Sequence, residues 1–291
     1  MSATYEAPLE AGEPSSTHKR LAIWTFSQKG GIGKTTLERA LRALARMHGT
    51  PSAAFDGEGP EGQFTQFEGT RNEYGELLNE NLKTIVPQDP LVGCFPFDVK
   101  DNRQRDLIVN LAVNPYDLVF VDFPGGTLDQ LQNIGFGPDG VSEIVEAWTD
   151  VGFEVVILVP IGPLLYSVRS VSKAMDHFKG ANVLVAMMGA FVDFEEDFIQ
   201  YYGYVDSDGE QQHGNTRKRL LSDEEGGREM FVPKLSARTY SLLDARSLAF
   251  DEALEQPVKI VPDADKRRIR TYLKAVRSAL PDDIRIAICG E

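Results

Sequence analysis

Cysteine and histidine are scarce in this chain of 291 residues, which holds two of the first and four of the second. Two cysteines, Cys94 and Cys289, cannot form a disulfide framework, and neither has a metal-ligand neighbour in the sequence, so we expect both to be packing thiols. The histidines follow no metal-ligand spacing, which weighs against a zinc site or histidine catalysis. They are His18, His48, His177 and His213.

Basic residues are also in the minority, with 30 Lys and Arg against 44 Asp and Glu and a net charge of −14. Long hydrophobic runs are missing, since no stretch approaches the roughly 20 apolar residues of a membrane span. Residues 1–18 are polar and acidic and contain no apolar core of a secretory signal. We therefore expect this tail to be flexible and the protein to be cytoplasmic.

The most informative stretch is the glycine-rich run at residues 27–36, S-Q-K-G-G-I-G-K-T-T. Its three glycines let the backbone turn tightly enough to point N–H groups and a helix N-terminus at an anion. In such a P-loop, Lys34 reaches the β- and γ-phosphates and the Thr35 hydroxyl binds Mg²⁺. The run departs from the usual G-x-x-x-x-G-K-[ST] pattern, because Gln28 replaces the first glycine and an extra lysine, Lys29, precedes the glycine pair.

The residues on either side of this run fit a P-loop. Residues 21–26, L-A-I-W-T-F, form a short apolar run that is typical of a buried parallel strand. Beyond Lys34, apolar residues recur with helical spacing, and Gly49 stands where a glycine ends a helix. Strand, glycine loop and helix are the order that a P-loop requires.

The stretch from Lys29 to Thr35 matches K-G-G-x-G-K-[ST] at every position, and it resembles the deviant Walker A loop of ATPases of the ParA/MinD type. The resemblance implies that ATP and Mg²⁺ are the cofactors. It also implies that Lys29 reaches across an ATP-sandwiched homodimer to the nucleotide of the partner subunit. The nucleotide-binding residues that it implies are Gly30, Gly31, Ile32, Gly33, Lys34, Thr35, Thr36 and, in a loop bordering the adenine, Pro233.

Two further segments support this resemblance, and each ends a predicted strand with a carboxylate. Residues 117–122, D-L-V-F-V-D, precede F-P-G-G-T, which is similar to the family's D-x-P-x-G switch. Asp122 stands at the end of this strand, where ligands bind in open α/β sheets, and can hold Mg²⁺ through water. Asp56 matches the first aspartate of the family's D-x-D-P segment, and Glu58 replaces the second. We expect Lys29, Lys34, Asp56, Glu58 and Asp122 to carry catalysis, and Thr35, Asp56 and Asp122 to hold the metal.

The loop around Glu58 departs from the family pattern. The residue expected to orient the attacking water is here a longer carboxylate, and an extra glycine precedes Pro60, so we expect slow hydrolysis. Residues 57–62 also make a formal G-x-G-x-x-G, the signature of a dinucleotide site. We set that interpretation aside, because a proline and two glutamates occupy the turn and no obvious apolar-periodic helix follows Gly62.

Apolar strand candidates alternate with helical segments along the chain. Residues 154–160 and 182–188 are strand candidates, and a helix is expected over 167–179 between them. Residues 231–235 resemble the family's last strand, followed by a helical stretch over 242–254. The sequence predicts an α/β fold with a doubly wound, mostly parallel sheet and helices on both faces. We expect residues 19–291 to form a single ATP-binding domain.

Two segments stand out by their charge. Residues 193–229 carry eleven Asp and Glu against four Lys and Arg, and are expected to be an insertion, either solvated or serving as a docking element or lid. Residues 265–280 are expected to form an amphipathic helix with a basic stripe, either solvated or in contact with the DNA backbone. Residues 284–291 look extended, which weighs against a membrane-targeting helix. The basic stripe consists of Lys266, Arg270, Lys274 and Arg277.

These patterns favour a ParA-like ATPase that binds Mg-ATP, forms an ATP-sandwich dimer and hydrolyses slowly under stimulation by a protein partner. The implied role is a switch in plasmid or DNA partition, positioning or conjugative transfer. The alternative is an ATP-binding recruitment module with negligible hydrolysis that acts through a protein partner. ATP-driven reduction and metal delivery on the same fold are disfavoured, because they need paired cysteines or a C-x-x-C motif.

Overall fold

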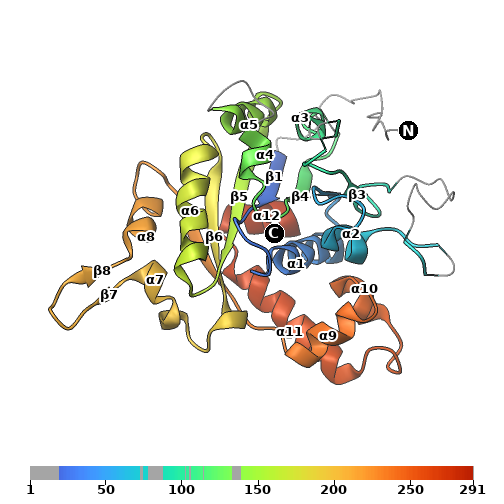
Figure 1. Cartoon of the computed structure of the whole chain (residues 1–291). Helices are drawn as coiled ribbons and strands as arrows, with labels where there is room; N and C mark the ends of the chain where they lie inside the picture. The colour runs from blue at the N-terminus through green and yellow to red at the C-terminus, as the bar shows by residue number, and fades with distance from the viewer. Residues whose placement is uncertain are drawn as a thin grey trace.

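At the centre of the protein is a sheet of seven strands in the order β3-β2-β4-β1-β5-β6-β9, and every neighbouring pair runs parallel (Figure 1). The strands are β1 (Arg20–Thr25), β2 (Ala53–Asp56), β3 (Phe95–Pro96), β4 (Leu118–Asp122), β5 (Phe153–Ile161), β6 (Asn182–Met188) and β9 (Arg228–Val232). The computed structural model describes residues 20–72, 75–77, 88–101, 103–104, 106–113, 115–132 and 139–290. The expected tail, residues 1–18, lies outside these ranges.

The strands are buried on both faces, as is usual for a parallel sheet. In β1, Leu21 and Ile23 point into one core, whereas Ala22 and Trp24 point into the other, because successive side chains leave a strand on opposite faces. In the core that contains Trp24, this ring lies edge-on to Trp148 with 5.4 Å between ring centroids. The apolar run that predicts a buried strand before the glycine loop thus contributes to two cores.

Helices cover both faces of the sheet, which confirms the predicted doubly wound fold (Figure 1). One core is closed by α3 (Leu107–Asn110), α4 (Leu128–Gln132), α5 (Gly140–Asp150) and α6 (Leu165–His177). The other is closed by α1 (Lys34–Met47), α2 (Gln63–Glu68), α9 (Ala237–Asp244), α10 (Phe250–Glu255), α11 (Asp263–Ala279) and α12 (Asp282–Cys289). Among the described residues, no helix is both long enough and apolar enough to cross a membrane.

The prediction of an extended C-terminal segment is wrong, because residues 282–289 form α12. Three isoleucines alternate with other residues here, as they do in a strand. In the structure, however, Ile284 and Ile288 are buried one helical turn apart, while Ile286 is about half exposed. Two aspartates in the first turn favour the helix through its dipole. The alternation in the sequence therefore concealed a four-residue spacing.

Two other segments also differ from the sequence-based expectation. The helical stretch expected over 242–254 is interrupted, since α9 ends at Asp244 and α10 begins at Phe250. Ser247, in the connection, has a positive φ of 47°, which a continuous helix does not allow. A short helix, α2, does begin directly after Gly62, where we expected none.

The acidic segment 193–229 is an ordered extension at one end of the sheet. It comprises η3 (Glu195–Asp197), α7 (Ile199–Tyr202), β7 (Tyr204–Val205), β8 (Gln211–Gln212) and α8 (Asn215–Leu220). At its base, Arg217 donates two hydrogen bonds to the Glu229 carboxylate, at 2.9 and 2.6 Å, and the Tyr201 hydroxyl donates to the same group at 3.0 Å. From this base the β7-β8 hairpin projects at the left of Figure 1, away from the sheet.

Candidate nucleotide-binding site

The loop between β1 and α1 has the backbone of an anion-binding turn. Gly31 and Gly33 have positive φ values of 75° and 95°, a region that residues with a side chain rarely adopt. A Cβ on Gly33 would also lie 2.9 Å from the Cε atom of Met188. Helix α1 begins at Lys34, so the N–H groups of its first turn face the space that this loop encloses.

Helix α6 braces the start of this loop. The Gln28 N–H donates to the Ser170 hydroxyl at 3.2 Å, and the Lys173 ammonium donates to the Gln28 side-chain carbonyl at 2.9 Å. The exposed Lys29 ammonium lies 5.0 Å from the centroid of the Tyr166 ring. The two residues that depart from the usual P-loop pattern therefore both contact α6, which no motif in the sequence indicates.

The predicted switch loop after β4 packs directly on the P-loop. A Cβ on Gly125 would lie 2.8 Å from the Gly30 nitrogen, so only glycine fits this contact. The Gly126 N–H donates to the Ser27 carbonyl at 3.2 Å. The Thr127 hydroxyl closes the loop by donating to the Pro124 carbonyl. A movement of either loop would therefore be transmitted to the other.

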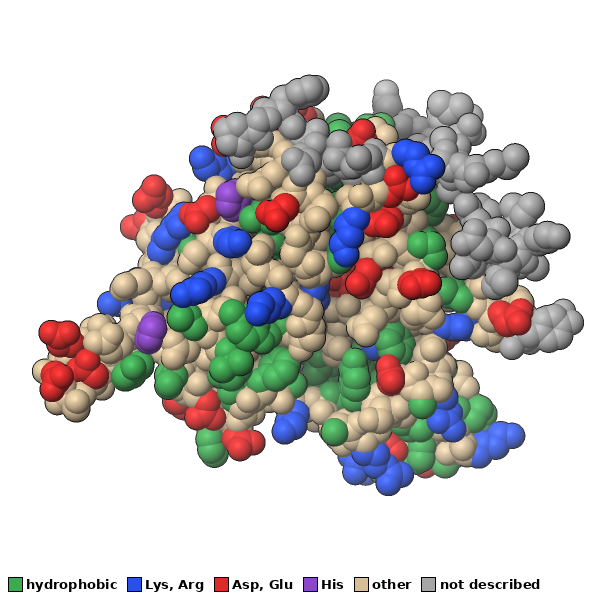
Figure 2. Space-filling view, in the orientation of Figure 1, with side chains coloured by type: hydrophobic (Ala, Val, Ile, Leu, Met, Phe, Trp, Pro, Cys, Tyr) green, Lys and Arg blue, Asp and Glu red, His purple; other side chains and the backbone are tan. Residues whose placement is uncertain are grey.

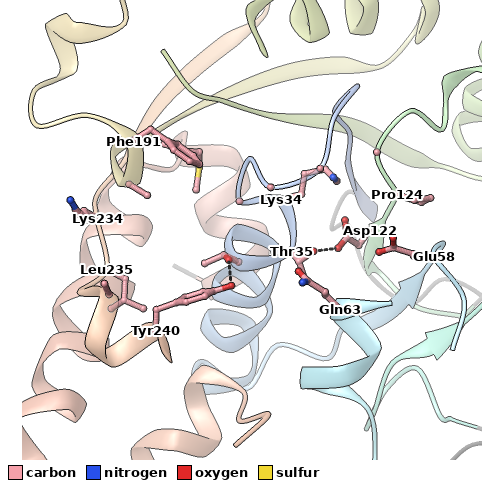
Figure 3. A pocket seen from close by; sticks show the side chains of 18 of the residues that line it. Lys34, Thr35, Glu58, Gln63, Asp122, Pro124, Phe191, Lys234, Leu235 and Tyr240 are labelled. Atoms are coloured by element: carbon pink, nitrogen blue, oxygen red, sulfur yellow. Dashed lines mark hydrogen bonds between the residues drawn. The ribbon is translucent and has the colours of Figure 1, made fainter. Parts of the chain in front are cut away.

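Thr35 and Asp122 meet at the floor of the site (Figure 3). The Thr35 hydroxyl donates to Asp122 Oδ2 at 2.5 Å, whereas Asp122 Oδ1 is buried and has no hydrogen-bond partner among the residues that the structure describes. Burial and the negative charge of Asp56 raise the pKa of Asp122 to about 7. A hydroxyl beside a carboxylate oxygen without a partner fits Mg²⁺, which prefers oxygen ligands. Thr35 and Asp122 are the residues that would hold this ion.

Asp56, which the sequence leads us to expect in catalysis and metal binding, contacts the loop that carries Glu58. Its carboxylate accepts hydrogen bonds from the Glu58 N–H at 2.9 Å, the Thr65 N–H at 2.8 Å and the Thr65 hydroxyl at 3.1 Å. Burial raises the pKa of Asp56 to about 6, against the lowering effect of these hydrogen bonds. A Cβ on Gly62 would lie 2.2 Å from Asp56 Oδ2. Asp56 therefore holds the Glu58 loop in place, and it does not join Thr35 and Asp122 in lining the pocket within the described part of the chain.

These residues surround one end of a pocket of about 660 Å³, a volume within the usual range for small-molecule sites. The exposed Glu58 lies beside Asp122 at this end (Figure 3). Lys29 and Ile32 lie outside the lining, Lys29 on the surface and Ile32 buried. Of the residues predicted from the sequence, Gly30, Gly31, Gly33, Lys34, Thr35, Thr36, Glu58, Asp122 and Pro233 line the pocket.

The other end of the pocket is mainly apolar and aromatic, although Lys234 also lines it, and apart from Pro233 it was not predicted. Phe191 comes from the segment after β6, Leu235 from the loop after β9, Tyr240 from α9 and Tyr272 from α11. These elements are far apart in the sequence, so no local motif connects them. An anion-binding loop that opens into an apolar, aromatic end can hold a ligand with a phosphate chain and a flat apolar part.

A carboxyl group that the sequence analysis missed lies under the loop. Glu38, one turn beyond Lys34 on α1, is fully buried. Burial and then the charge of Asp122 raise the pKa of Glu38 well above its usual value. The sequence gives one indication that Glu38 is buried: it stands next to apolar residues of α1, whereas a surface helix usually carries its glutamates on the solvent face.

Apolar side chains gather on the face of the molecule that carries the pocket (Figure 2). They belong to the start of α6 and to the segment that follows β6. One of them, Phe191, also lines the pocket. The exposed residues are Leu164, Leu165, Phe191, Phe194 and Ile199.

No family model and no curated protein matches the sequence. Among solved structures, the chain is similar to a ParA family ATPase from Chlorobium tepidum TLS, with 17% identity, a TM-score of 0.47 and coverage of 89% of this chain and 99% of that one. It is also similar to a nucleotide-binding protein in complex with ADP from Archaeoglobus fulgidus, with 15% identity, a TM-score of 0.43 and coverage of 81% and 89%. It is similar as well to the MinD cell division protein of Aquifex aeolicus, with 18% identity, a TM-score of 0.40 and coverage of 87% of this chain and 97% of that one.

Proposed function

We propose that this protein is a nucleotide switch of the ParA/MinD type that binds Mg-ATP, closes into a dimer around it and hydrolyses it slowly. The observation that carries the proposal is the Thr35–Asp122 pair beside Lys34, at the glycine-loop end of a pocket that is apolar at its other end. The loop N–H groups and the Lys34 ammonium stabilise the charge of the phosphates, and Mg²⁺, when bound, offsets more of it. Glu58, on the loop that Asp56 holds, orients the attacking water.

Dimer closure is supported by Lys29 and its surroundings. The Lys29 side chain lies on the surface, against Tyr166, and not in the pocket of its own subunit. The apolar residues exposed on the same face, such as Phe191 and Leu164, form a patch of the kind that often marks an interaction surface. A second copy that faces this patch would bring its triphosphate toward Lys29.

The cargo of such a switch is a further part of the proposal. Arg270 and Lys274 on α11 are exposed, beside the face that carries the buried Ile269 and Leu273, and would contact phosphates of DNA in a role in partition, positioning or conjugative transfer. The competing function is an ATP-binding recruitment module with negligible hydrolysis. It is favoured by the projecting β7-β8 hairpin, where Val205 is 64% exposed and available to a protein partner.

The test of the nucleotide site is Lys34→Ala, which removes the cation from the phosphates. We expect the affinity for Mg-ATP, measured by calorimetry, to fall about 100-fold or more, because a charge-assisted contact in a site shielded from water is lost. The circular dichroism spectrum should stay unchanged. The matched control is Lys179→Ala, an exposed lysine after α6, which should bind as wild type does. Wild-type affinity in Lys34→Ala would refute the P-loop assignment.

A further inference from the structure

Tyr240 links two walls at the apolar end of the pocket. It belongs to α9, and its hydroxyl lies 3.5 Å from the hydroxyl of Thr36, in the first turn of α1 (Figure 3). Thr36 directly follows Thr35, the residue that meets Asp122. The phenol ring of Tyr240 therefore lies next to the phosphate-binding turn, and it forms part of the pocket wall.

The face of this ring is available. Tyr240 is only half-buried, and in the described ranges of the chain it stacks on no other aromatic ring. At the same end of the lining, Leu235 lies on one side of the ring and Phe191 across from it, and the Lys234 side chain lies near both (Figure 3). An aromatic face among mainly apolar side chains, beside an anion site, fits a planar heterocycle that is joined to a phosphate chain.

We propose that Tyr240 is the stacking platform for the base of the nucleotide. It thereby makes the site specific for a nucleoside triphosphate over an inorganic polyphosphate. This inference rests on the proposed function, because it requires the phosphates to lie at Lys34. The base stacks on the ring while the phosphates extend toward the first turn of α1, and the contact with Thr36 fixes the ring in the orientation that accepts the base.

The experiment compares two ligands, Mg-ATP and inorganic triphosphate with Mg²⁺, by calorimetry on the full-length protein. In Tyr240→Ala we expect the affinity for ATP to fall about 5- to 100-fold, the range that stacking of a base on an aromatic ring supplies. The affinity for inorganic triphosphate should stay within twofold of wild type. Tyr240→Phe keeps the ring and should keep ATP affinity within about threefold of wild type.

Two further variants separate stacking from a structural role. Tyr240→Leu preserves an apolar side chain without a π-face, so it should lose ATP affinity as Tyr240→Ala does, and it covers the case in which the alanine variant unfolds. Tyr204→Ala, on the exposed β7 strand, is the matched tyrosine control and should bind both ligands as wild type does.

The inference is overturned if Tyr240→Leu binds ATP as wild type does, or if ATP and triphosphate lose affinity equally, since a structural defect would weaken both. Failure of the proposed function has a different signature. In that case the wild type binds neither ligand, or Lys34→Ala binds both normally. A loss confined to ATP in the Tyr240 variants, together with a loss of both ligands in Lys34→Ala, supports the inference and the proposed function together.

Discussion

At the scale of single residues, helix α1 buries charged side chains on several sides. Glu38, Arg39 and Arg42 are all buried. The Arg39 guanidinium lies 3.4 Å from the centroid of the Phe67 ring, and its Nη2 donates to the Leu248 carbonyl at 2.9 Å. These partners lie 28 and more positions further along the chain. Apolar spacing therefore predicts this helix but not the environment of its charges.

A buried carboxylate between α1 and α2 gives a stability prediction. Glu68 of α2 is buried, with Oε2 2.6 Å from Arg46 Nη1 and 3.9 Å from Arg42 Nε. Glu68→Gln keeps the shape but leaves the buried Arg42 without its carboxylate and leaves Arg46 only Asp251, at 3.6 Å, so we expect the free energy of unfolding in urea to fall by about 3 kcal/mol. Glu225→Gln, in the more exposed pair with Arg219, is the matched control and should cost less than about 1 kcal/mol. Similar losses in the two variants would contradict a special role for the buried group.

Asp122 gives a second prediction at this scale. Asp122→Asn keeps an oxygen for the Thr35 hydroxyl and removes the charge that would hold Mg²⁺. We expect Mg²⁺-dependent hydrolysis to fall about 100-fold or more, while ATP affinity without metal changes less than threefold. Phosphate release and calorimetry measure the two quantities, with the exposed Asp176→Asn as the control. An equal loss of both would mean that Asp122 has a structural role.

At the scale of elements, the sequence predicts best where one segment contains the whole signal. The strand expected over 182–188 is confirmed to the residue, and the strand, glycine loop and helix around residues 27–36 are also confirmed. The aromatic end of the pocket could not be predicted, because Phe191, Tyr240 and Tyr272 come from three separate elements that only the tertiary fold brings together. In α12, the isoleucines alternate as in a strand but are also spaced as in a helix, and the alternation led to the wrong prediction of an extended segment.

The basic face of α11 gives a prediction at this scale. If Lys266, Arg270 and Lys274 contact DNA, the affinity for a DNA duplex should fall steeply with salt, with a log–log slope of about −0.9 for each phosphate neutralised. The double variant Arg270→Glu, Lys274→Glu should flatten that slope by about two units, as fluorescence anisotropy would measure. The double variant Lys179→Glu, Lys218→Glu makes the same change in net charge just after α6 and on α8, and should leave the slope unchanged.

The prediction fails if the protein binds no DNA at low salt, or if reversing the charges of Arg270 and Lys274 leaves the slope unchanged. The exposed face of α11 would then be an ordinary solvated surface. The buried face of this helix does not depend on that outcome, since Ile269, Leu273 and Val276 pack in the core in either case. Weight would then shift to a protein partner, and to the projecting hairpin as its contact.

At the scale of the whole molecule, the site lies where several parallel strands end together. Strands β1 and β4 pair in register up to Thr25 and Asp122, and β2 pairs with β4 up to Asp56. The loops that leave these ends therefore meet, which is the general position of ligand sites in open α/β sheets. The switch loop contacts the P-loop through Gly125, and α6 contacts it through Ser170. A nucleotide bound to the P-loop can therefore affect both the switch loop and the surface formed by α6.

The last prediction concerns this outer face and the exposed Lys29. Inside one subunit a lysine before the glycine pair has no phosphate to contact, and here it rests 5.0 Å from the Tyr166 ring centroid, outside the pocket. We therefore expect Mg-ATP to double the mass measured by light scattering, most clearly in the Glu58→Ala background, where hydrolysis is slowed. Lys29→Ala should bind ATP through Lys34 and yet stay monomeric, because the cation that meets the facing triphosphate is lost, whereas Lys179→Ala should dimerise normally. A wild type that remains monomeric at saturating ATP, or a Lys29→Ala variant that dimerises, would remove the sandwich mechanism and leave the recruitment module as the better account of this site.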